Sequence, residues 1–117
     1  MTWESRTRII VLVPFPRTYT QFLIAEKVIS DLMQLCGGVT YSDQYSPVFE
    51  GRWYNPRTSR TVSDPHVLVW GDARIRIFDP ALEYYLSRLK RQLQHDFNQE
   101  LAWITAHEIL RLTTHDP

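Results

Sequence analysis

Apolar and polar positions alternate with two periods along the chain and predict a strand, a helix, two strands, a helix and a strand. Arg8–Val13 is β-branched and apolar on both faces, as is typical of a central strand, and Pro14 ends it because proline has no N–H to donate. His66–Trp70 is equally apolar and is expected to end at Gly71-Asp72. The last strand is predicted over Leu101–Leu110, where apolar and polar residues alternate.

The first helix is predicted from about Tyr19 to Leu35. Thr18 and Gln21 match a capping box at its start, and Gly37-Gly38 supply a left-handed exit. Its apolar residues recur at helical spacing: Phe22, Ile29, Leu32, Met33 and Cys36.

The second helix begins after Asp79, an N-cap residue that is followed by Pro80 at the first helical position. Between the helices, Val39–Ser42 and Val48–Tyr54 predict an extended region that is bulged or broken around Pro47. Asn55–Pro65 is rich in turn formers and predicts an exposed hairpin connection. One apolar stripe defines the second helix: Leu82, Tyr85, Leu86, Leu89, Leu93 and Phe97.

This order of elements is typical of the ferredoxin-like split βαβ superfold, an α+β arrangement in which two helices cover one face of an antiparallel sheet. The crossover rule places the first and third strands in parallel contact and seats the last strand beside the first. The expected order is four, one, three, two, with the most apolar strands in the middle. We expect one domain over residues 1–117, with a core from about 6 to 112 and a polar tail from Thr113.

The amino-acid composition limits the kinds of partner and binding site that we expect. Thirteen Lys and Arg residues balance thirteen Asp and Glu residues, so no overall field attracts anionic lipid, and nucleic acid is not expected as a partner. Cys36 is the only cysteine, which excludes an internal disulfide and a four-cysteine zinc site, and we interpret it as a small buried hydrophobe. The first sixteen residues hold no apolar run long enough for export or a membrane span, so we expect a cytoplasmic protein.

Alternation assigns candidate side chains to the sheet face that the helices leave open. Val67 and Val69 are expected to pack under the helices, although a slip of one residue would reverse this assignment. The open face then carries His66, Leu68, Trp70, Trp103, Thr105 and His107. Such a face is too apolar to stay in contact with water, so we expect a second copy to cover it, as a dimer or a higher oligomer. A cleft for a small ligand is the lesser alternative.

Two further groups of residues are candidates for ligand contact. His66 and His107 are candidate catalytic residues, because imidazole transfers protons and binds metals; no metal site is expected, since no metal-binding histidine spacing is present. Arg52, Trp53, Arg57 and Arg60 could contact an anionic or planar ligand. The alternative for this second group is an edge strand with a bulge at Gly51 and a solvated loop.

No phosphate loop, nucleophile elbow, zinc-protease motif or calcium loop occurs in the sequence, and no cofactor is expected. The first hypothesis is therefore a small homo-oligomeric protein that works by binding, as an accessory or regulatory module. The alternative is a small enzyme of the dimeric α+β barrel kind, with a histidine in an aromatic pocket on the open face.

Overall fold

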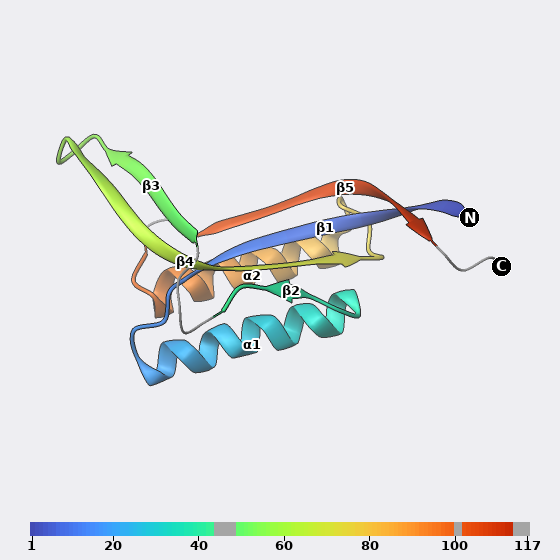
Figure 1. Cartoon of the computed structure of the whole chain (residues 1–117), viewed down its shortest axis with the longest axis horizontal. Helices are drawn as coiled ribbons and strands as arrows, with labels where there is room; N and C mark the ends of the chain where they lie inside the picture. The colour runs from blue at the N-terminus through green and yellow to red at the C-terminus, as the bar shows by residue number, and fades with distance from the viewer. Residues whose placement is uncertain (44–48, 100–101, 114–117) are drawn as a thin grey trace.

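The computed structural model describes residues 1–43, 49–99 and 102–113. In these residues five strands and two helices follow one another along the chain: β1 (Thr2–Pro14), α1 (Tyr19–Cys36), β2 (Thr40–Tyr41), β3 (Phe49–Asn55), β4 (Arg60–Ala73), α2 (Pro80–Asp96) and β5 (Trp103–Thr113). Both helices lie on the same side of the sheet, and the other side carries no helix (Figure 1). Three residues of the predicted elements lie outside the described residues: Pro47 of the irregular stretch, Val48 of the extended region and Leu101 of the last strand.

The strands lie in the order β2-β4-β1-β5, with β3 also paired to β4, and all of these pairs are antiparallel. The α+β ferredoxin-like arrangement and its predicted strand order are therefore confirmed. The expected parallel contact between the first and third strands is wrong, because β1 and β4 run antiparallel. The crossover through α1 instead joins β1 to β2, and β4 lies between these two strands.

The hairpin formed by β3 and β4 is longer than the sequence predicts. Only residues 56–59 form the turn, and β4 begins at Arg60, so most of the predicted exposed connection is paired strand. The register runs without interruption past Gly51, which faces Asp64, so the bulge expected there is absent. Gly71 and Asp72 likewise lie inside β4 and do not end it. Pairing between neighbouring strands has overridden the local preference of these turn-forming residues.

The same hairpin gives the molecule its elongated shape, which measures 55 × 29 × 24 Å. It rises on the side of the sheet opposite the helices, so it flanks the uncovered face (Figure 1). The α1–β2 connection and the far ends of β1, β4 and β5 lie at the opposite end of the sheet from the hairpin. No helix in the described ranges is both long and apolar enough to cross a membrane.

Both predicted helix starts are confirmed by their caps. Thr18 Oγ1 accepts the Gln21 N–H at 3.1 Å, while Gln21 Oε1 accepts the Arg17 N–H at 2.9 Å. Asp79 Oδ1 accepts the Ala81 N–H at 2.9 Å, immediately beside the proline that opens α2. The bonds from the Gln21 and Ala81 N–H groups satisfy donors that the first turn of each helix leaves without a partner.

The end of α1 also follows the sequence prediction. Gly37 adopts the left-handed conformation with φ of 79°, and its N–H donates to the Met33 carbonyl at 2.8 Å. This turn reverses the chain so that β2 can run back along the edge of β4.

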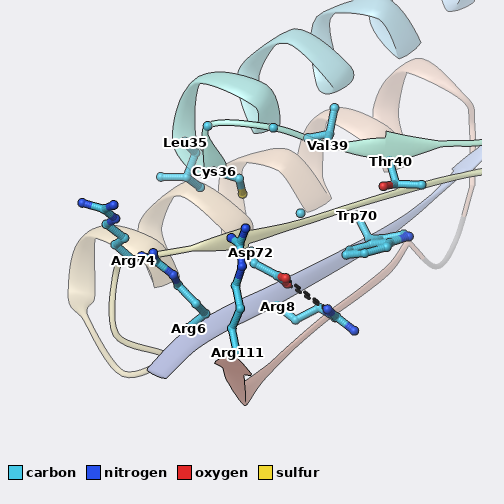
Figure 2. A pocket seen from close by; sticks show the side chains of 13 residues that line it. Arg6, Arg8, Leu35, Cys36, Val39, Thr40, Trp70, Asp72, Arg74 and Arg111 are labelled. Atoms are coloured by element: carbon cyan, nitrogen blue, oxygen red, sulfur yellow. Dashed lines mark hydrogen bonds and ion pairs between the residues drawn. The ribbon is translucent and has the colours of Figure 1, made fainter. Parts of the chain in front are cut away.

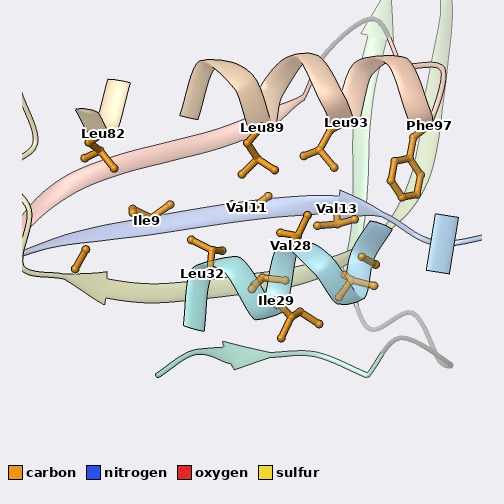
Figure 3. Packing of buried hydrophobic residues seen from close by; sticks show 14 residues of the cluster. Ile9, Val11, Val13, Val28, Ile29, Leu32, Leu82, Leu89, Leu93 and Phe97 are labelled. Carbon is orange, nitrogen blue, oxygen red and sulfur yellow. The ribbon is translucent and has the colours of Figure 1, made fainter. Parts of the chain in front are cut away.

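The hydrophobic core fills the space between the sheet and the two helices (Figure 3). The predicted stripe of α2 is confirmed, whereas that of α1 is rotated, because Ala25 and Val28 are buried and Met33 is half-exposed. The core consists of Ile9, Val11, Val13, Ala25, Val28, Ile29, Leu32, Val67, Val69, Ala73, Leu82, Leu89, Leu93 and Phe97.

Candidate functional site

The open face of the sheet is built from cross-strand rows of side chains. Val67 and Val69 are fully buried on the helix side, as predicted, so the residues that alternate with them lie on the uncovered side. Trp103 keeps 47% of its surface exposed there. In the order β4, β1, β5 the rows are Asp72, Arg8 and His107; Trp70, Ile10 and Thr105; and Leu68, Leu12 and Trp103.

The two candidate catalytic histidines are not brought together. His66 pairs with Pro14 of β1, whereas His107 pairs with Arg8, six residues away along the same strand. Six residues of strand span about 20 Å. His66 is 4% exposed and its Nδ1 lies 2.8 Å from the Asp64 carbonyl oxygen, while His107 is exposed. Within one chain these side chains cannot serve the same reacting group.

The arginines singled out in the sequence lie on the hairpin arm. Arg52 belongs to β3, Arg57 to the turn and Arg60 to the start of β4, and all three are exposed. The Arg57 N–H donates to Asn55 Oδ1 at 3.0 Å, which shapes the turn. Trp53 lies in the same arm.

A cavity of about 740 Å³ lies at the opposite end of the sheet, where β1, β4 and β5 pass the α1–β2 connection (Figure 2). It takes in Trp70 and Asp72 from the rows of the open face. Its full lining is Arg6, Arg8, Leu35, Cys36, Gly37, Gly38, Val39, Thr40, Trp70, Gly71, Asp72, Arg74 and Arg111.

A bidentate ion pair between Arg8 and Asp72 forms one wall of this cavity. Arg8 donates from Nε to Asp72 Oδ1 at 2.8 Å and from Nη2 to Oδ2 at 3.0 Å. The Arg8 guanidinium also lies 4.4 Å from the centre of the Trp70 ring. The hydrogen bonds from Arg8 lower the pKa of Asp72, and the charges of Arg111 and Arg6 lower it further. Asp72 is therefore a carboxylate at neutral pH.

The α1–β2 connection lies against the strand at a position where only glycine fits. A Cβ atom on Gly71 would lie 2.9 Å from Cys36 Sγ and 2.9 Å from the Gly38 carbonyl oxygen. Burial raises the pKa of the Cys36 thiol to about 11, and the charge of Asp72 acts in the same direction. The thiol is therefore protonated at neutral pH and is a poor nucleophile.

Sequence reasoning missed Arg6, Arg74 and Arg111, which the fold collects around Asp72. One signal was available: Arg6 and Arg8 are two residues apart in a strand and must share a face. The contributions of Arg74 and Arg111 depend on how β4 and β5 pair with β1, which the sequence does not state. No group of three or more potential metal-binding side chains occurs in the described part of the chain.

No protein-family model and no curated protein sequence matches this chain. Among solved structures, the chain is similar to a phage SAM lyase in complex with S-methyl-5'-thioadenosine. The TM-score is 0.57 and the sequence identity is 15%, over 89% of this chain and 80% of the lyase chain. At this identity the similarity establishes a common fold.

Proposed function

We propose that the protein is a homo-oligomeric binding module of accessory or regulatory type, whose copies contact one another through the open sheet face. The observation that carries the proposal is that Trp103, half-exposed, lies on a sheet face that no helix covers. Leu12 of β1 lies directly opposite Trp103, and Leu68 of β4 is the next side chain in the same row. A contiguous apolar face of this kind is typical of a protein contact.

A second copy of the chain is the occupant that fits this face best. The formal net charge is zero, so copies do not repel one another strongly. A two-fold contact needs only one self-complementary patch, and the apolar rows in the middle of the face supply it. The hairpin of β3 and β4, whose strand β3 carries Arg52 and whose turn carries Arg57, flanks the same face and would adjoin this contact. A cytoplasmic location is part of the proposal and is supported by the single unpaired thiol.

The Trp103→Asp variant tests this contact. A carboxylate in the middle of an apolar interface is left without a partner, so we expect the variant to sediment as a monomer at concentrations at which the wild type is oligomeric. Tyr84→Asp is the matched control, because Tyr84 is exposed on the outer surface of α2. Dissociation by Trp103→Asp alone supports the proposal. Equal behaviour of the two variants contradicts it.

A small enzyme is the second candidate, and the similarity to the phage SAM lyase favours it, because the shared fold covers most of both chains. The cavity beside Trp70 offers an aromatic ring to a nucleoside-like ligand such as S-methyl-5'-thioadenosine. His107 is the better placed of the two candidate proton-transfer residues, because it pairs with Arg8 at the cavity, whereas His66 is buried at the other end of the sheet.

Incubation with S-adenosylmethionine tests this second candidate. The reaction named for the fold relative predicts release of S-methyl-5'-thioadenosine, which chromatography separates from the substrate. Formation of the product by the wild type, with slower turnover for Trp70→Ala, would support the enzyme. If folded, oligomeric wild-type protein leaves S-adenosylmethionine unreacted, the enzyme candidate is contradicted and the binding module remains.

A further inference from the structure

Arg6 is the least expected side chain in the cavity wall. It is 8% exposed, and its buried Nε has no hydrogen-bond partner in the described part of the protein. Its Nη2 forms an ion pair with Glu4. A buried donor without a partner is costly, and a charged donor more so, because it has given up its contacts with water. The Nε itself is closed to solvent, so an anion in the cavity would offset this cost through the charge of the Arg6 guanidinium and not through a bond to Nε.

The charged side chains around Arg6 indicate the charge of a ligand that the cavity would bind. Four guanidinium groups line the cavity, from Arg6, Arg8, Arg74 and Arg111, against one lining carboxylate, Asp72. Arg8 is engaged by Asp72 through both of its oxygens. Within residues 1–43, 49–99 and 102–113, Arg74 and Arg111 have no ion-pair partner. Because Arg6 is paired with Glu4 and Arg8 with Asp72, the surplus of positive charge in the cavity lies on Arg74 and Arg111.

The C-terminal end of α1 opposes the binding of an anion. The carbonyl end of α1 reaches the cavity at Leu35 and Cys36, and a helix carries about half a negative charge at that end. Half a charge is smaller than the surplus carried by Arg74 and Arg111. The same helix end repels an anion from one wall, so the favoured position for an anion lies on the side of Arg6 and Arg111 (Figure 2).

We propose that this cavity binds the oxyanion group of a small molecule, a phosphate or a carboxylate, through Arg6, Arg74 and Arg111. A guanidinium presents parallel N–H donors that match two oxygens of either group. The Arg8–Asp72 pair and Trp70 form the adjoining wall, which holds the rest of the ligand. The site lies at the end of the sheet and does not depend on the contact between copies in the middle of the open face.

Titration with inorganic phosphate, followed by NMR of the arginine Nε–H groups, tests this site. Burial protects the Arg6 Nε–H from solvent exchange, so it should give a resolved signal that shifts in a saturable way as phosphate is added. Ionic strength is held constant with chloride. Arg111→Gln should weaken binding about tenfold, as expected for the loss of one charged hydrogen-bonding partner. Arg111 is exposed, so this change leaves the core intact.

Arg91→Gln is the matched control, because it removes one exposed positive charge on α2, outside the cavity, and should leave phosphate affinity unchanged. Asp72→Asn should increase affinity, because it removes the carboxylate that competes for the arginines. A parallel titration with succinate separates the two sources of oxyanion, and saturation by either one supports the site. Unsaturable shifts with both anions, or equal losses in Arg111→Gln and Arg91→Gln, would overturn the proposal whatever the oligomeric state.

Discussion

Arg8 holds both carboxylate oxygens of Asp72, at 2.8 Å from Nε and 3.0 Å from Nη2, across the two central strands of the sheet. The pair stands at a boundary on the open face. The next rows along the strands are apolar and begin with Trp70, whereas Arg6 lies two residues beyond Arg8 on the basic side. The Arg8–Asp72 ion pair and Trp70 thus lie where the surface proposed for self-association meets the cavity proposed for an anion.

The Arg8–Asp72 ion pair should make the protein less stable at acid pH. The pKa of Asp72 is lowered in the folded protein, so its contribution to stability is present above the unfolded-state pKa and is lost as the pH falls through the folded value. The urea midpoint of the wild type should therefore fall more steeply between neutral and acid pH than that of Asp72→Asn. Parallel curves for the two proteins would show that the ion pair contributes no pH-dependent stability.

Close approach at Gly71 predicts a difference between two glycines of the cavity. Gly71→Ala places a methyl group 2.9 Å from Cys36 Sγ and from the Gly38 carbonyl oxygen, so we expect a loss of about 1–3 kcal/mol in the free energy of unfolding. Gly38→Ala meets no atom within 4 Å and should change stability by less than about 0.5 kcal/mol. Urea denaturation measures both, and equal effects would contradict the close contact.

Burial of Cys36 predicts slow alkylation. The pKa of the thiol is raised to about 11, and the thiolate is the reactive form, so labelling by iodoacetamide should be slow at neutral pH and increase with a midpoint near that value. In denaturant the midpoint should return to about 9. Mass spectrometry follows the single labelled site. A native midpoint at or below that of the unfolded chain would show that the thiol is activated.

The parts of the fold that the sequence predicts correctly depend on local chemistry. Thr18 caps α1, Asp79-Pro80 starts α2 and Gly37 ends α1, and each of these acts within a few residues of chain. Strand order also follows from local features, because the two segments with continuous apolar runs occupy the middle of the sheet.

The parts that the sequence misses depend on pairing between distant residues. Ser63 and Asp64 favour turns locally, yet they pair with β3. His66 and His107 share a predicted face, but the register of β1 places them at opposite ends of it. The basic cavity is of the same kind, because it requires β1, β4 and β5 to meet at one level beside the end of α1. Alternation within one strand predicts the face of a side chain and not its neighbours on other strands.

Sedimentation velocity of the wild-type protein at micromolar concentration tests the central claim most directly. The proposal requires the open sheet face of one copy to be covered by another copy. We therefore predict a mass of twice 13.9 kDa or a higher multiple, with a monomer fraction that grows on dilution. A single species with the mass of one chain across this range would contradict the proposed self-association through the face that carries Trp103.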